Sequence, residues 1–528
     1  MSTGYDAIIV GGGHNGLVCA AFLARAGRKV LVLEARSIVG GFCTTAELLP
    51  AAPGFQISRC ASEFILTNVK PSVIDQLELE RYGLKWLAED PDPIMTYLGY
   101  DGSTLATWKS VDRTVEEIRK FSRRDAERYP VLVDLITNAL EVALPYVMGH
   151  PKRVRPDALV TMAWRLAKGR GKVAKGARIL TSSIDSVLDE WFESEQLKCQ
   201  LSVFALANFG PLKEVGSAFT LACLPGFHRY GMKRPIGGSI NFPNALVRCI
   251  EAHGGEVRVG TRVESIDVTG GHARGVTLTD GESLQARQVV AAVDPWTLVN
   301  RLLAPSVIPQ EVHEQVRAMP VNRFNISVFK VDAALSKAPE FPLAGRDRHV
   351  TSALTLCPSL DVLNHSLYDS IQGEVTVAPP LYAVQPSVCD RTLVPPGSDG
   401  ETLYLYALAA PYQLSGGRDW ATEKDGFADL MMKAFESYAP GSLDHVIDSV
   451  ALSPPEFDVE YNAYRGSYNH VDNVLSTLGP VRPVPGLSSY KTPVDGLWHT
   501  GSGAFPMGWL HGWPGRATSR DVLRALRR

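Results

Sequence analysis

A glycine-rich turn between two apolar strands is the feature that most constrains the fold of this chain. The turn is Gly11-x-Gly13-x-x-Gly16, and an apolar run over residues 7–10 leads directly into it. A helical pattern occupies residues 17–26, and a second apolar strand follows over residues 29–33. Strand, turn, helix and strand in this order are typical of a βαβ unit. We therefore predict a Rossmann-like α/β domain.

Each residue of this turn has an expected role in binding a dinucleotide. Gly11 permits the tight turn, Gly13 lets the backbone approach a pyrophosphate, and Gly16 lets the helix pack closely on the strand. The N-terminus of the helix offers N–H groups to the phosphates, where we also place His14 and Asn15. Glu34, at the end of the second strand, can accept hydrogen bonds from a ribose hydroxyl.

The residues after Glu34 favour FAD over NAD. Ala35 and Arg36 follow the acid, and paired glycines come next at Gly40 and Gly41. The paired glycines let the chain pass close to a cofactor because they have no Cβ, although an ordinary turn has the same composition. The carboxylate of Glu34 disfavours NADP, since it would face a 2′-phosphate.

The C-terminus is predicted to complete the cofactor site. Residues 496–503 are typical of a short strand that breaks into a glycine turn, and the last helix follows the segment 509–513. We expect Gly501, Ser502 and Gly503 to meet the ribityl chain and pyrimidine edge of a flavin. The N-terminus of the last helix would stabilise an anionic reduced flavin.

The cofactor domain is expected to be discontinuous. We assign it residues 1–90, 231–305 and 480–528. Residues 255–266 alternate as strands do, and their Val263 is included among the expected cofactor contacts. Residues 91–230, largely helical by pattern, and 306–479, with strand-like runs at 326–331 and 403–407, are inserted as an α+β substrate domain.

Composition excludes several other classes of protein. The chain has 528 residues, 45% of them hydrophobic, and a net charge of −3, which does not suggest a nucleic-acid partner. The eight cysteines are scattered, so neither a metal site nor a redox dithiol is predicted. No signal peptide pattern appears, and we expect a cytoplasmic protein with reduced thiols.

Residues 151–178 are unusually basic. They contain nine lysines and arginines but only one acid, Asp157. Apolar residues, including Leu159, Val160 and Trp164, are interleaved with the charges. One interpretation is a segment that rests on an anionic membrane surface. The alternative is a solvated basic face or a mobile loop.

Both ends of the chain resemble a known family. The segments 5–18, 31–41 and 53–60, together with 482–486, 490–493, 496–503 and 514–516, are similar to those of the phytoene desaturase-like (carotenoid dehydrogenase-related) FAD oxidoreductases. Their subgroup called pyridine nucleotide-disulfide oxidoreductase domain-containing protein 2 is the most similar. The resemblance implies a GR2-type FAD domain, non-covalent FAD, and redox chemistry on apolar, often polyene or terpenoid, substrates.

The resemblance weakens just before the last helix, where relatives often carry a glycine-rich stretch. Here Trp509, His511 and Trp513 occur instead. His511 is a candidate acid or base or cofactor contact, with a hydrogen-bonded structural histidine as the alternative. Trp509 and Trp513 are candidates for lining a substrate cavity, with core packing as the alternative.

We expect a dehydrogenase or desaturase that transfers hydride from a hydrophobic substrate to flavin N5. A redox-neutral double-bond isomerase, an amine-oxidase-like enzyme and a flavoprotein that only binds a partner are the alternatives. No hydrolase, zinc-protease or P-loop motif is present.

Overall fold

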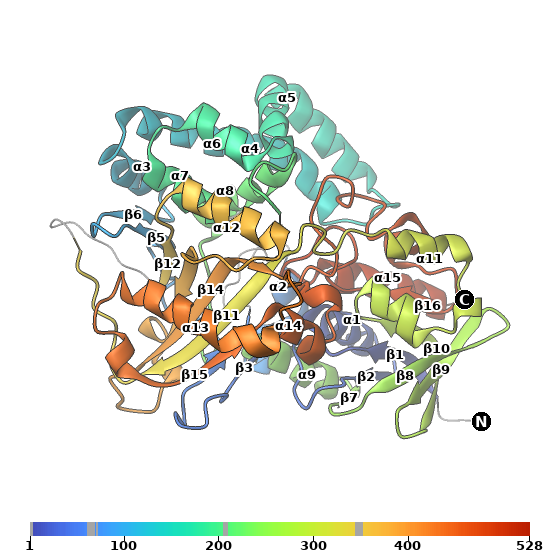
Figure 1. Ribbon diagram of the computed structural model, residues 1–528. Coiled ribbons are helices and arrows are strands. Elements are labelled where there is room, and N and C mark those ends of the chain that lie inside the picture. The colour runs from blue at the N-terminus through green and yellow to red at the C-terminus, as the bar shows by residue number, and fades with distance from the viewer. Residues whose placement is uncertain (1–3, 61–68, 70–71, 204–209, 344–351, 528) are drawn as a thin grey trace.

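Two β-sheets and a group of helices make up the molecule (Figure 1). The computed structural model describes residues 4–60, 69, 72–203, 210–343 and 352–527. The first sheet lies beside both chain ends, the second sheet lies next to it, and most of the helices from the first half of the chain cover the top in this view.

The first sheet has a parallel centre. Its strands run in the order β7-β2-β1-β10-β9-β8, and β16 also pairs with β10. They are β1 (Tyr5–Val10), β2 (Val30–Leu33), β7 (Glu256–Arg258), β8 (Val263–Thr269), β9 (His272–Leu278), β10 (Ser283–Ala291) and β16 (Leu497–His499). β7, β2, β1, the end of β10 and β16 are parallel, whereas β8 and β9 extend the sheet as an antiparallel hairpin. Helices cover the parallel strands, which explains their unbroken apolar sequences.

Three helices pack together on the first sheet. They are α1 (His14–Arg25), α9 (Asn241–Ala252) and α15 (Trp513–Leu526), with α1 in contact with both others. The α1 helix begins three residues before the predicted start, because Gly13 is already its N-cap. A Cβ on Gly515 would lie 2.2 Å from the carbonyl oxygen of Asn15, so α15 approaches α1 at backbone distance.

The second sheet is mostly antiparallel, in the order β15-β11-β14-β13-β12-β5-β6. Its strands are β5 (Met95–Leu98), β6 (Thr104–Thr107), β11 (Ile326–Leu335), β12 (Ala353–Leu356), β13 (Leu381–Val384), β14 (Glu401–Pro411) and β15 (Val446–Leu452). The predicted strands at 326–331 and 403–407 are β11 and β14. Prediction missed β5 and β6, because these four-residue strands are buried throughout and therefore show no alternation.

Helices account for most of the remaining chain. The upper group is α3 (Val111–Arg119), α4 (Arg123–Val147), α5 (Pro156–Thr181), α6 (Ile184–Trp191), α7 (Glu195–Ser202) and α8 (Cys223–Tyr230). Others are α2 (Val73–Leu77), α10 (Pro295–Thr297), α11 (Gln310–Arg317), α12 (Leu360–Gln372), α13 (Trp420–Glu436) and α14 (Pro454–Tyr461), with the short strands β3 (Thr45–Ala46) and β4 (Ile57–Ser58). The basic segment 151–178 is thus largely the helix α5. These elements confirm the predicted α/β fold.

Candidate functional site

The turn after β1 contains glycines of two kinds. Gly11 has φ +104°, and a Cβ there would lie 2.8 Å from the carbonyl oxygen of Ala292. A Cβ on Gly16 would lie 2.3 Å from the carbonyl oxygen of Gly11. These two glycines therefore allow the turn and α1 to pack against the strands. A Cβ on Gly13 would meet no protein atom within 4 Å. The space beside Gly13 is thus free for a ligand.

The second glycine pair lies against this turn. The amide of Gly40 donates a 2.9 Å hydrogen bond to the carbonyl of Gly12. A Cβ on Gly41 would lie 3.5 Å from the Cα of Gly13. Because Gly40 and Gly41 have φ values of +110° and +58°, side chains would also be strained there. The two glycine segments therefore form adjacent walls of one space.

Glu34 links the two glycine segments to the end of β2. One carboxylate oxygen accepts a 2.7 Å hydrogen bond from the amide of Gly12, and the other accepts a 2.8 Å bond from the amide of Arg36. The carboxylate is therefore held beside the turn, with remaining lone pairs available for a ribose hydroxyl. The Arg36 guanidinium is in turn held by Glu460 at 3.2 Å and lies over the ring of Tyr461.

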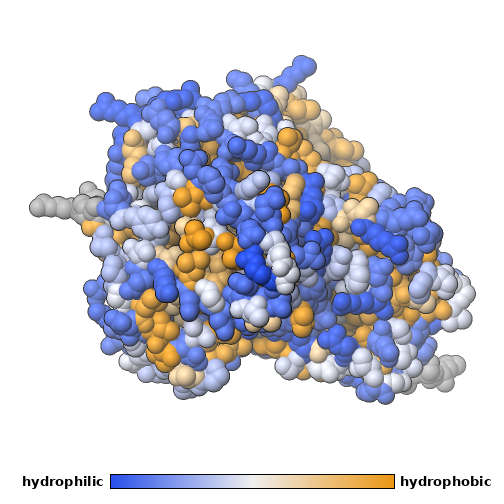
Figure 2. Space-filling view, in the orientation of Figure 1, coloured by the Kyte–Doolittle hydropathy of each residue, from blue (hydrophilic) through white to orange (hydrophobic). Residues whose placement is uncertain are grey.

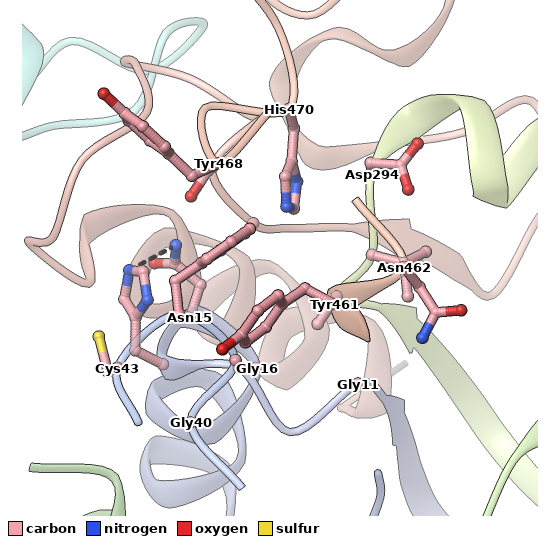
Figure 3. Close-up of a pocket in the computed structure, with 18 of the residues that line it drawn as sticks. Gly11, Asn15, Gly16, Gly40, Cys43, Asp294, Tyr461, Asn462, Tyr468 and His470 are labelled. Atoms are coloured by element: carbon pink, nitrogen blue, oxygen red, sulfur yellow. Dashed lines mark hydrogen bonds between the residues drawn. The ribbon is translucent and has the colours of Figure 1, made fainter. Parts of the chain in front are cut away.

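These segments border a cavity of about 640 Å³ that continues between the two sheets. Figure 3 shows its polar end, with the glycine turn below and a loop that carries Tyr468 and His470 above. Most residues predicted to bind a cofactor or substrate line this cavity. They are Gly11, Gly13, His14, Asn15, Gly16, Glu34, Ala35, Arg36, Gly40, Gly41, Val263, Gly501, Ser502 and Trp509.

Gly503, His511 and Trp513 are not among the lining residues. A Cβ on Gly503 would lie 2.9 Å from the ring of Pro295, so this glycine packs against α10. The ring of His511 accepts a 3.1 Å hydrogen bond from the amide of Trp513 and contacts the Met507 carbonyl at 3.3 Å with its other nitrogen. The Trp513 indole stacks on this imidazole at 4.4 Å. This geometry fits the structural alternatives considered for His511 and Trp513.

Sequence reasoning missed several lining residues, including Asp294 and His470. Asp294 follows β10, and the carboxyl end of a parallel strand is a signal that could have identified it. The loop that carries His470 has no comparable pattern. Its backbone is unusual, because Asn462, Arg465 and His470 have φ values of 49°, 56° and 60°. Non-glycine residues adopt this left-handed conformation only where the surrounding structure holds them.

Four polar atoms of residues that line this end of the cavity are buried without a hydrogen-bond partner among the described residues. They are Asn15 Oδ1, Asp294 Oδ2, the Tyr461 hydroxyl and His470 Nδ1. Burial raises the pKa of the Asp294 carboxyl to about 6 and lowers the pKa of His470 to about 3. Near neutral pH this end of the cavity therefore carries a carboxylate, an amide oxygen and an uncharged imidazole, and Figure 3 shows the ring of His470 pointing toward the glycine turn. A dinucleotide with ribityl and ribose hydroxyls fits this set, and the start of α1 fits its pyrophosphate.

The other end of the cavity is apolar and aromatic. Its walls come from the second sheet and the upper helices, with Met95, Val203, Cys223, Phe227, Met232, Tyr382, Tyr404 and Tyr406. Burial raises the pKa of Tyr406 well above its usual value. The hydroxyl of Tyr404 donates to the carbonyl of Cys60 at 3.1 Å. This wall is therefore uncharged.

A buried ion pair lies beside the tyrosine wall, on the same face of the second sheet. Lys330 on β11 is fully buried, and its Nζ lies 2.5 Å from a carboxylate oxygen of Asp332 and 4.1 Å from the centre of the Tyr404 ring. Arg59 continues the chain of charges from Asp332 to Glu460, at 3.8 and 3.4 Å. Because Glu460 also binds Arg36, these ions connect the second sheet to the end of β2.

The fold and this cavity define a two-domain flavoprotein with a Rossmann-like FAD domain. The chain belongs to the flavin containing amine oxidoreductase family, whose model matches residues 16–367. It is therefore an FAD-dependent oxidoreductase, as predicted from the sequence. No group of three or more histidine, cysteine or acidic side chains able to hold a metal ion occurs in the part of the chain that the structure describes.

Curated relatives match over nearly their full length. The chain is 29% identical over 558 residues to the mouse pyridine nucleotide-disulfide oxidoreductase domain-containing protein 2, covering 99% of this chain and 94% of the relative. It is 27% identical to a limonene dehydrogenase polypeptide of Castellaniella defragrans, covering 99% and 95%. It is 24% identical to a lycopene-forming phytoene desaturase of Pantoea ananas, covering 98% of each chain. The predicted likeness to phytoene desaturase-like flavoenzymes is confirmed.

Solved structures share the fold. An oxidoreductase from Methanosarcina mazei superposes with a TM-score of 0.63 at 16% identity, covering 98% of this chain and 99% of the other. Cyclohexylamine oxidase from Brevibacterium oxydans superposes with a TM-score of 0.59 at 18% identity, covering 99% of this chain and all of the other. At these identities the comparison concerns the fold alone.

Proposed function

We propose that the enzyme dehydrogenates an apolar substrate of the terpenoid or polyene class. One observation carries this proposal. Every charged residue that lines the cavity lies in segments 34–36, 262–264 or 294–301, which belong to the first sheet and its connections. The described lining from the second sheet and upper helices is apolar, aromatic or uncharged. A long hydrocarbon would bury its surface there without leaving a polar group unpaired.

The side chains that line the cavity favour loss of a hydride from the substrate before loss of a proton. With a pKa near 3, the imidazole of His470 is a weak base, and the buried tyrosine hydroxyls remain protonated. Bound FAD supplies the hydride acceptor at its N5 atom. The substrate loses a hydride from one carbon and a proton from the next carbon to water, and gains one C=C bond. The apolar wall positions the chain for this transfer.

The curated relatives support this substrate class. The names of two of them refer to limonene and to phytoene. An external electron acceptor then reoxidises the cofactor in each turnover.

Anaerobic reduction of the bound flavin tests the proposal. Purified holoenzyme is mixed without oxygen with a monoterpene, a carotenoid precursor in detergent, or a primary amine. We expect the oxidised-flavin absorbance to disappear with a terpenoid or polyene and a dehydrogenated product to form in an amount equal to the flavin. Reduction by the amine alone would contradict the proposal. Product formed repeatedly with the flavin still oxidised and no acceptor present would instead indicate isomerisation.

Amine oxidation is the second candidate, favoured by one specific observation. Five tyrosines, Tyr382, Tyr404, Tyr406, Tyr461 and Tyr468, line the same cavity. The rings of Tyr404 and Tyr406 are 5.7 Å apart and inclined at 66° to each other. Aromatic faces attract cations and amines. The amine arm of the anaerobic experiment distinguishes this candidate from the first.

A further inference from the structure

The first half of α5 packs only partly on the rest of the protein. Between residues 156 and 172 no side chain is buried, although α5 packs against α4 along its length. Four large apolar side chains are exposed there. Leu159, Val160, Trp164 and Leu166 have exposed fractions of 52%, 68%, 59% and 47%. In Figure 2 hydrophobic residues gather at the upper right of the molecule, where Figure 1 places α5.

These apolar side chains share one side of the helix. At roughly 100° per residue, Leu159, Val160, Trp164 and Leu166 fall within an arc of about 160°. The helix is kinked at Gly169, and its buried residues, from Val173 onward, come after the kink. Before the kink the four exposed side chains therefore form one apolar face.

Positive charge surrounds the apolar face. Of the basic residues in the segment 151–178, Lys152, Lys168, Arg170 and Lys175 form no ion pair with any residue in the described part of the chain. Two further basic residues, Lys172 and Arg178, line a groove of about 840 Å³ between α4, α5 and α6. They pair with Asp134 and Glu190. An excess of unpaired cations beside an exposed apolar face matches an anionic lipid surface.

The hairpin of α4 and α5 is fastened to the cofactor domain. Asp521 on α15 accepts hydrogen bonds from His150, at 3.0 Å, and from Arg153. Arg516 of the same helix donates to the Met148 carbonyl at 2.5 Å. The α15 helix follows directly after Trp509 and Leu510, which line the cavity. The exposed face is therefore held in a fixed position relative to the active site.

The α4 helix, which packs against α5, is partly exposed at its C-terminal end. It is long and apolar enough to cross a membrane by length and composition, and only 22% of its most apolar window is buried. Core helices of soluble proteins pass the same test, but their apolar residues are mostly buried. Residues 141–147 of α4, which adjoin α5, are all partly exposed.

We propose that the exposed apolar face of α5, with its flanking lysines and arginines, binds an anionic lipid bilayer. The helix lies in the plane of the headgroups, with Val160 and Trp164 in the acyl boundary and the basic side chains at the phosphates. This surface is separate from the cavity, so its test does not depend on the proposed substrate.

Vesicle flotation with the FAD-loaded full-length protein tests the proposal. The two probes are vesicles of phosphatidylcholine alone and vesicles that also contain phosphatidylglycerol. We expect the protein to float with the anionic vesicles at low salt, and the bound fraction to fall as salt is added. Absence of flotation with anionic vesicles at low salt, or equal flotation with both vesicle types, would overturn it.

Matched variants locate the surface. The double variant Val160→Ser with Trp164→Ser, and the double variant Arg170→Gln with Lys175→Gln, should each lower the partition coefficient by roughly tenfold or more. The controls are Val377→Ser, at a residue 85% exposed between α12 and β13, and Arg274→Gln on β9. Both controls should float as the parent does. All variants should keep the bound-flavin spectrum, which reports intact folding.

Other partners give distinct outcomes. If vesicle flotation is absent and the α5 variants abolish retention on duplex DNA, this face binds nucleic acid. If they instead abolish self-association in solution, this face binds a second copy of the chain. Either result would overturn the lipid assignment.

Discussion

The fully buried guanidinium of Arg482 donates a 3.0 Å hydrogen bond to the carbonyl of Ser502. The same nitrogen donates to the carbonyls of Asn469 and Val471, at 3.2 and 2.9 Å. His470 lies between these two residues, so Arg482 holds its imidazole against the turn after β16. One cation thus joins two segments of the cavity wall, the loop that carries His470 and the turn after β16.

Replacing Arg482 with methionine should therefore destabilise the protein and loosen the cofactor. Four carbonyl groups would lose a donor, and we expect a loss of about 3 kcal/mol in the free energy of unfolding. FAD should also dissociate more readily. Urea unfolding followed by tryptophan fluorescence measures the first effect, and flavin release measures the second. Arg274→Met, at an exposed position on β9, is the control, and equal urea midpoints for the two variants would contradict this prediction.

Gly13→Val should abolish FAD binding while the fold stays intact. A Cβ on Gly13 meets no protein atom within 4 Å, and its φ of −67° suits any residue. The added side chain would thus occupy only the space meant for the ligand. We expect FAD affinity to fall by at least ~100-fold, as an added clash of about 3 kcal/mol implies. Fluorescence titration of the apoprotein with FAD measures it, and a yellow protein with parental affinity would show that the pyrophosphate lies elsewhere.

Gly16→Ala should show the opposite pattern to Gly13→Val. Its Cβ would lie 2.3 Å from the Gly11 carbonyl oxygen and 2.8 Å from the Ala292 side chain, so α1 would have to move. Overpacking of this kind costs about 1–3 kcal/mol of stability. Thermal unfolding of the two variants without FAD separates the two roles, and an unchanged unfolding temperature for Gly16→Ala would contradict the packing role.

Asp294 should make FAD binding depend on pH. Asp294 lines the cavity with one carboxylate oxygen unpartnered, and burial raises its pKa to about 6. A hydroxyl that donates to the ionised carboxylate favours binding, so affinity should fall as the pH drops through about 6 and level off above it. Asp294→Asn should bind FAD roughly tenfold or more weakly, with a flat pH profile over this range. Equilibrium titrations at several pH values measure both effects. A parallel pH dependence in the two proteins would rule Asp294 out as the titrating group.

Flavin reduction by the substrate should be nearly independent of pH around neutrality. With the pKa of His470 lowered to about 3 and that of Tyr406 raised, neither group titrates in this range. Rapid-mixing measurements of the reduction rate check this. A bell-shaped profile centred near neutral pH would instead point to a general base at the reacting carbon.

Phe227→Ser should weaken the binding of an apolar substrate without affecting the binding of the flavin. Phe227 on α8 lines the apolar end of the cavity, away from the charged lining segments. Loss of its contact should lower kcat/KM by about 5- to 150-fold, which corresponds to 1–3 kcal/mol of buried apolar surface. Phe227→Leu, which keeps the wall apolar, should retain most activity. Steady-state kinetics with the best terpenoid substrate distinguishes the two variants, and equal losses would contradict an apolar contact.

Residues predicted from the sequence line the cavity where their position depends on local backbone geometry. The short segment 11–41 contains the glycines of the first turn, Glu34 and the paired glycines at 40 and 41. Their spacing alone therefore indicates the nucleotide end of the cavity. Trp509 also lines the cavity, whereas His511 and Trp513 pack together at the start of α15. The sequence could not separate these three residues, because a turn before a helix can direct neighbouring side chains either way.

The sequence by itself therefore determined the βαβ unit, the dinucleotide end and the family. Only the tertiary structure decided the rest of the cavity, which Asp294, His470 and the tyrosines of the second sheet complete. Those residues come from separate segments of the second half of the chain and meet only because two sheets pack side by side. The tertiary structure also decided that the basic segment forms a partly exposed helix. Charge alone does not show which side chains form ion pairs or pack on the protein.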